Sequence, residues 1–193
     1  MRIVRIAAMS GCLLLPVFAD AWRIDRGASN GSVHFQIDRA SPGAYFYRMS
    51  LSFPQGRIQG LPDTIPVSGS ARFVYTHDAG NLLCEGKFGS WLGLGALASG
   101  GYRFEPNDRF GAELRKLGYE APSGDQAFHM AVIDVSLAFA RAAREAGYRF
   151  STTDLISLRA HGVDVPYLRR LHDSGMRNLN AEQISKLKTY DVD

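Results

Sequence analysis

The C-terminal half of this 193-residue chain repeats one short phrase three times. An aromatic residue is followed eight positions later by Gly and then by Tyr or Met. The glycines recur at nearly equal intervals, with a period in the range that is typical of stacked supersecondary units. Such units bury their apolar sides against one another, and they form binding surfaces more often than active sites. The three phrases run from Phe110 to Gly118-Tyr119, from Phe139 to Gly147-Tyr148 and from Tyr167 to Gly175-Met176.

Helical periodicity begins after Pro106. A first helix is predicted to end at Gly118, because glycine commonly stops a helix. The next is predicted as one long helix over 125–146, since its apolar residues recur at steps of three and four. Ser123 and Gln126 match a capping box at its start.

The following unit is predicted as two helices separated by Gly162. Ser151 is the expected N-cap of the first and Asp164 of the second. A third unit begins at Asn180, so the chain from 106 to 193 is expected to form short α-helical repeats packed on or beside a sheet.

Residues 31–104 carry the alternation of apolar and polar residues, with a period of two, that indicates half-buried strands, and the β region is predicted over 22–105. One apolar face and one polar face predict an antiparallel sheet covered on a single side. The fold class is therefore predicted as α+β, with the sheet first and the helices after it. The clearest apolar positions are Val33, Phe35 and Ile37, then Tyr47, Met49, Leu51 and Phe53, then Ala71, Phe73 and Tyr75.

Residues 1–21 have the pattern of a secretory signal peptide. Arg2 and Arg5 precede an apolar run from Ile6 to Phe18, and Ala19-Asp20-Ala21 offers a small-x-small cleavage site. The run is too short for a transmembrane helix, and no later stretch predicts a transmembrane span. We therefore expect a periplasmic or secreted protein cleaved after Ala21. The alternative is a lipoprotein that is modified at Cys12.

Cleavage after Ala21 would leave Cys84 as the single cysteine. Leu82, Cys84 and Phe88 are expected on one strand face, with Glu85 and Lys87 on the other. Cys84 is therefore interpreted as a small buried hydrophobic residue rather than a nucleophile.

No motif predicts catalysis, a metal or a cofactor. The Gly-rich stretch 89–101 lacks a phosphate-binding Gly-Lys-Ser/Thr sequence, and the chain has no His-Glu-x-x-His, Cys-x-x-Cys or Gly-x-Ser-x-Gly. The net charge is +3, and it falls to +2 when the two arginines and one aspartate of residues 1–21 are removed. Nucleic acid is therefore not an expected partner.

Five arginines are the candidate partner-binding residues. Arg115 and Arg144 each lie three positions before a repeat glycine, whereas Arg141 and Arg169 each lie six before. With Arg170, they would form a basic ridge on stacked helices, suited to an anionic partner. The other interpretation is an ordinary solvated helix face.

The run from Asp78 to Asp193 contains a series of short motifs: Asp78-Ala79-Gly80, Glu85-Gly86, Phe104-Glu105-Pro106-Asn107, Leu117-Gly118-Tyr119 and the phrase from Asp154 to Val163. In this series the run resembles poorly characterised exported bacterial proteins and the extracytoplasmic region attached to beta-lactam-sensor-type membrane metallopeptidases. The peptidase zinc motif lies in a part that this chain lacks. The resemblance therefore implies a sensing or binding role in the cell envelope.

Two functions are consistent with these observations. The first is an exported, non-enzymatic binding or sensing module whose partner is an envelope protein or an anionic envelope component. The alternative is a periplasmic hydrolase whose His or carboxylate residues cannot be paired from sequence, because catalytic residues need not be neighbours in the chain.

Overall fold

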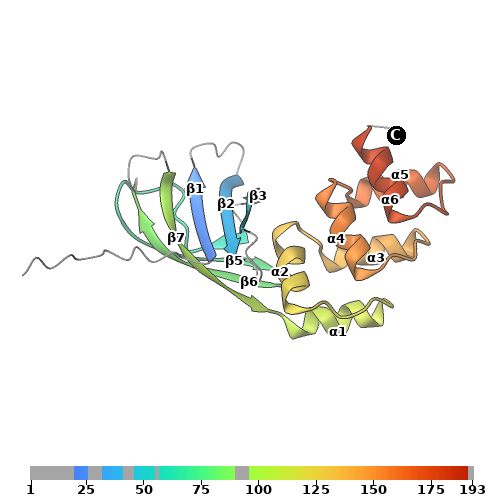
Figure 1. The fold of residues 1–193 in the computed structure, drawn as a ribbon, viewed down its shortest axis with the longest axis horizontal. Helices are drawn as coiled ribbons and strands as arrows, with labels where there is room; N and C mark the ends of the chain where they lie inside the picture. The colour runs from blue at the N-terminus through green and yellow to red at the C-terminus, as the bar shows by residue number, and fades with distance from the viewer. Residues whose placement is uncertain (1–19, 26–31, 41–45, 55–56, 90–95, 191–193) are drawn as a thin grey trace, which may run out of the picture.

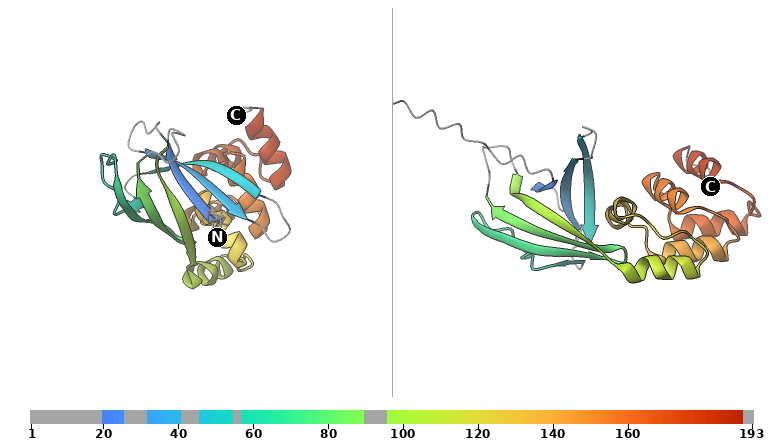
Figure 2. Two further views of the ribbon diagram at one scale, coloured as in Figure 1. Left: turned by 60° about the vertical axis from the view of Figure 1, so that its left-hand side comes forward. Right: turned by 60° about the horizontal axis from the view of Figure 1, so that its bottom comes forward.

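The computed structural model describes residues 20–25, 32–40, 46–54, 57–89 and 96–190. A curled antiparallel sheet forms one end of the molecule, and short helices extend away from it at the other (Figure 1). The views in Figure 2 show the helices continuing outward from one end of the sheet instead of covering its face. The predicted α+β class, with the sheet first and the helices after it, is confirmed.

In the described ranges, seven strands form one antiparallel sheet in the order β3-β2-β1-β7-β6-β5-β4. The first and last strands, β1 and β7, therefore pair in the middle of the sheet, and two meanders run outward from them. The strands are β1 (Asp20–Asp25), β2 (Ser32–Ala40), β3 (Phe46–Pro54), β4 (Ile58–Gln59), β5 (Gly69–His77), β6 (Gly80–Phe88) and β7 (Ala96–Pro106).

The inner face of the curled sheet is filled mainly by its own side chains, with Phe128 and Val132 of α2 joining them. Trp22 packs edge-on against Phe73 with ring centroids 4.8 Å apart, and Phe35 packs against the same ring at 5.5 Å. The indole Nε1 of Trp22 donates to the carbonyl of Gly101 at 2.8 Å, so this buried ring keeps its hydrogen bond. Cys84 is also buried here, as predicted, and burial raises the pKa of its thiol.

Two glycines allow β6 and β7 to approach closely. Gly86 and Gly100 lie opposite each other in the ladder. A Cβ added to Gly100 would lie 2.0 Å from the carbonyl oxygen of Glu85, and one on Gly86 would lie 2.2 Å from that of Ser99. Neither position therefore accepts a side chain.

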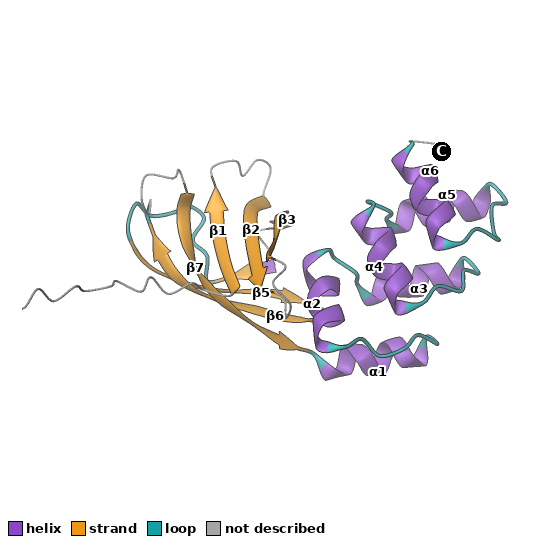
Figure 3. Cartoon of the chain, viewed as in Figure 1, coloured by secondary structure: helices purple, strands orange, loops and turns teal. Residues whose placement is uncertain are grey.

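Within residues 96–190, six helices of nine residues each follow the sheet (Figure 3). Alternate helices pack side by side, so the stack has an odd layer of α1, α3 and α5 and an even layer of α2, α4 and α6. Within the even layer, α2 also contacts β6 and β7. The helices are α1 (Asp108–Lys116), α2 (Gly124–Val132), α3 (Leu137–Glu145), α4 (Thr152–Ala160), α5 (Val165–Asp173) and α6 (Ala181–Thr189).

The long helix predicted over 125–146 is wrong. Two helices, α2 and α3, occupy this range, and Asp134 lies between them with a left-handed φ of 62°. Gly162 occupies the equivalent turn of the next repeat, between α4 and α5, with φ 77°. The range 125–146, whose apolar periodicity predicts one continuous helix, is therefore a pair of short helices like α4 and α5.

The predicted helix starts are confirmed. Ser123 with Gln126 forms a capping box on α2, Ser151 caps α4, and Asp164 caps α5. The repeated aromatic residues lie in the core of the stack, where Phe139 and Tyr167 are buried. Among the described residues, no helix is both long and apolar enough to cross a membrane.

Candidate functional site

Four of the five candidate arginines are exposed on the odd layer. Arg115 lies on α1, Arg141 on α3, and Arg169 and Arg170 on α5. Arg141 and Arg169 occupy equivalent positions on adjacent helices, and neither forms an ion pair with the described residues. We call these four residues the basic ridge.

Arg144 has a different environment. Its half-buried guanidinium donates to the carbonyls of Leu117 at 3.0 Å and Gly118 at 2.8 Å, which lie at the end of α1. It also contacts the carbonyls of Tyr148 and Phe150, and its Cζ lies 4.0 Å from the ring centroid of Tyr119. Arg144 therefore joins two repeats, and we leave it out of the surface offered to a partner.

The contrast between Arg115 and Arg144 follows from their place in the stack. The two residues are equivalent in sequence, but α1 is the first helix of the odd layer. In the part of the chain that the structure describes, no helix of this layer precedes α1, so Arg115 has no such carbonyls to bind and its side chain remains exposed. Two further exposed arginines, Arg149 and Arg177, each lie two positions after a repeat glycine, a signal that the sequence analysis missed.

A charged cluster joins the sheet to the helices. Asp134 lies in the turn between α2 and α3. Its carboxylate accepts hydrogen bonds from Arg57 Nη1 at 2.7 Å and from Arg159 Nη2 at 3.3 Å. Arg159 also donates through Nε to the backbone carbonyl of Asp134 at 3.0 Å. His77 Nε2 lies 3.3 Å from Asp134 Oδ1, without the alignment of a hydrogen bond. We call Arg57, His77, Asp134 and Arg159 the junction cluster.

The contacts of the junction cluster keep the Asp134 carboxyl ionised. Burial opposes ionisation of the Asp134 carboxyl, but His77 and Arg57 outweigh it and lower its pKa to about 2. His77 Nδ1 accepts from the backbone N–H of Ala79 at 3.1 Å, so a neutral ring carries its hydrogen on Nε2, which faces the carboxylate. The His77 side chain is only 1% exposed.

The hairpin between β5 and β6 gives a structural role to the motifs Asp78-Ala79-Gly80 and Phe104-Glu105-Pro106-Asn107. The Asp78 carboxylate accepts from the backbone N–H of Leu137 at 2.9 Å, in the first turn of α3. Asn107 donates from its backbone to the carbonyl of Ala79 and from its side chain to that of Asp78, at 3.0 Å each. Gly80 lies so close to β7 that a Cβ would meet the ring of Phe104. These motif residues therefore dock the hairpin against the helices.

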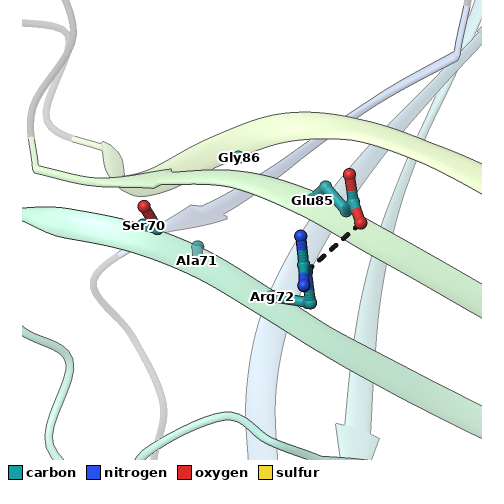
Figure 4. Close-up of a pocket in the computed structure, with 5 residues that line it drawn as sticks. All are labelled: Ser70, Ala71, Arg72, Glu85 and Gly86. Atoms are coloured by element: carbon teal, nitrogen blue, oxygen red, sulfur yellow. Dashed lines mark ion pairs between the residues drawn. The ribbon is translucent and has the colours of Figure 1, made fainter.

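A shallow hollow of about 520 Å³ lies on the sheet, away from the junction cluster. It is lined by Ser70, Ala71, Arg72, Glu85 and Gly86 on β5 and β6 (Figure 4). Arg72 and Glu85 form an ion pair at 3.2 Å across its wall. Within the described ranges, no three His, Cys, Asp or Glu side chains are grouped in a way that could hold a metal ion.

Comparison of the chain with protein families, with curated proteins and with solved structures finds no match. The site is therefore interpreted from its own geometry.

Proposed function

We propose that this protein is an exported, non-enzymatic binding or sensing module of the bacterial cell envelope, and that its basic ridge contacts the partner. One observation carries the proposal: Arg141 and Arg169 are exposed at equivalent positions on adjacent stacked helices, without an ion pair among the described residues. Guanidinium groups bind carboxylates and phosphates through paired N–H donors. The partner is therefore an envelope protein or envelope component with an anionic surface.

The junction cluster supports the non-enzymatic proposal over a hydrolase. It brings a histidine from the sheet beside a carboxylate from the helices, which is the pairing that acid–base catalysis would need. However, the ring of His77 is enclosed, and Asp134 already contacts Arg57 and Arg159. A group that transfers protons to a substrate must come within hydrogen-bond reach of it. The contacts of this cluster instead favour a role in holding the sheet and the helices together.

The partner proposal is tested by affinity capture from native periplasm with three forms of the protein. The wild-type chain is compared with Arg141→Gln/Arg169→Gln and with a control, Arg103→Gln/Lys186→Gln, that removes the same charge from exposed positions outside the basic ridge. We expect an envelope component that is retained by the wild type and the control but lost by the ridge variant. Equal retention by all three forms would show that the basic ridge is not the contact surface.

Export is tested separately by mass spectrometry of the protein recovered from the producing cells. We expect the mature chain to begin at Trp22, because Ala19-Asp20-Ala21 is the predicted cleavage site. This cleavage would keep Trp22 and Ile24 of the central strand β1 in the core. A diacylated Cys12 at the N-terminus would instead establish the lipoprotein alternative.

A further inference from the structure

A row of polar side chains crosses the outer face of the sheet. Each residue of the row pairs with the next one on the neighbouring strand. Along its own strand, each is flanked by residues that point into the core or are glycine. Neighbouring strands are about 4.8 Å apart, so the row across six strands is roughly 24 Å long. In order from β5 to β3, this polar row consists of Ser70, Lys87, Ser99, Arg23, Gln36 and Ser50.

The polar row is positively charged. It contains Lys87 and Arg23 but no carboxylate, and Lys87 forms no ion pair with the described residues. Arg23 lies 3.6 Å from Asp38, and its side chain remains 34% exposed.

The carboxylates in the adjacent row are neutralised. Asp38 is bound by Arg48 through Nε at 2.7 Å and Nη2 at 3.1 Å, and Glu85 is paired with Arg72. Because Asp38 is shared between Arg48 and Arg23, the face keeps an excess of positive charge.

The shallow hollow lies at the β5 end of the same face. Its lining includes Ser70, the first member of the polar row, and the outward pair Arg72 and Glu85. Gly86 contributes no side chain, so part of the floor is backbone (Figure 4). A chain that lies along the polar row would reach a recess at this end that presents the Ser70 hydroxyl group and the Arg72–Glu85 ion pair.

We propose that the outer face of the sheet binds an acidic polysaccharide that lies across the strands along the polar row. Lys87 and Arg23 would bind carboxylates on the sugars, because charge-assisted hydrogen bonds are the stronger ones. The serine hydroxyls and the Gln36 amide both donate and accept, as sugar hydroxyls require. The row contains no aromatic residue on which nucleic-acid bases could stack. This ligand surface is separate from the basic ridge on the helices.

The test measures the dissociation constant of the purified protein for polygalacturonate, with dextran as the neutral polymer. Lys87→Gln is the main variant, because Lys87 is exposed and its replacement leaves the ladder intact. The control is Arg103→Gln, which removes the same charge from the outer face of β7, where Arg103 pairs with Glu105 at 2.8 Å. We expect Lys87→Gln to weaken binding roughly tenfold, the loss of one charge-assisted hydrogen bond, and Arg103→Gln to change it less than about twofold.

A second variant, Gln36→Ala, removes an amide from the middle of the polar row and should also weaken binding. Equal binding of dextran, absence of binding to polygalacturonate, or equal losses in Lys87→Gln and Arg103→Gln would overturn the proposal. If binding is lost instead in Arg141→Gln/Arg169→Gln, the polymer binds the helices, which contradicts the polar row but not the proposed function. If the wild-type protein captures no envelope component but binds polygalacturonate as expected, the proposed function fails while the polar row stands.

Discussion

Arg144 and His172 occupy equivalent positions on α3 and α5, and each binds the end of the preceding helix of the odd layer. Arg144 Nε donates to the Leu117 carbonyl at 3.0 Å, and His172 Nδ1 lies 3.0 Å from the Ala146 carbonyl. Because a carbonyl only accepts, the Nδ1 of His172 carries the hydrogen. The last carbonyls of a helix have no hydrogen-bond partner within that helix. Arg144 and His172 each supply a partner for one such carbonyl of the preceding helix.

We expect Arg144→Ala to lower the free energy of unfolding by about 2–3 kcal/mol. The substitution removes hydrogen bonds to Leu117 and Gly118 and the contact with the Tyr119 ring. The control is Arg115→Ala, the exposed equivalent on α1, which should change stability by no more than about 0.5 kcal/mol. Urea unfolding of both variants provides the measurement. Equal effects would show that Arg144 does not join the repeats.

The second prediction concerns acid unfolding through Asp134. Its folded pKa of about 2 lies below the ordinary 3.8, so its stabilising contribution is complete above about pH 4 and is lost as the pH falls towards 2. Because the side chain is 46% exposed, solvent screening reduces the contribution to about 1 kcal/mol. Asp134→Asn should remove this dependence, while Asp173→Asn, at an exposed residue, should keep it. Urea melts between pH 5 and 2 test this, and parallel pH curves for wild type and Asp134→Asn would contradict it.

The break at Asp134 shows what the sequence alone could not establish about the helices. The apolar steps continue across Asp134, which is neither glycine nor proline, so no ordinary stop signal ends α2. The indications were its alignment with Gly162 in the next repeat and the alignment of Ser136, the N-cap of α3, with the N-cap Asp164 of α5. Aspartate adopts the left-handed conformation more readily than most residues, and here Arg57 and Arg159 bind it in place.

The third prediction tests the stacking of the repeats. Phe139 and Tyr167 are buried at equivalent positions, so truncation of either to Ala should cost about 3–5 kcal/mol. The matched surface variants Arg141→Ala and Arg169→Ala should each cost no more than about 0.5 kcal/mol. Denaturant melts of the four variants provide the measurement. If the arginine variants unfold as readily as the aromatic ones, the basic ridge is not a free surface.

The candidate surfaces were only partly predictable. Equivalent spacing found the exposed pair Arg141 and Arg169, but it also selected Arg144, whose guanidinium binds backbone carbonyls of the neighbouring repeat. Period-two alternation predicted which residues point outward on the strands that contain Phe35, Met49 and Phe73, but it missed β1 and did not predict which strands pair. The polar row depends on register: Arg23 and Lys87 lie opposite the same residue, Ser99, although they are far apart in the sequence. A shift of one residue in either strand would turn its side chain to the other face.

The last prediction concerns the close approach of β6 and β7. Gly100→Ala should lower the free energy of unfolding by about 2–4 kcal/mol, because the new Cβ would lie 2.0 Å from the Glu85 carbonyl oxygen. The neighbouring atoms are backbone, so the ladder itself must shift to relieve the overlap. The control is Gly124→Ala at the start of α2, where a Cβ meets no atom within 4 Å and stability should change by no more than about 0.5 kcal/mol. Urea melts of both variants provide the comparison. If Gly100→Ala is as stable as Gly124→Ala, the strands do not approach as closely as described, and the register of the polar row across β6, β7 and β1 must be revised.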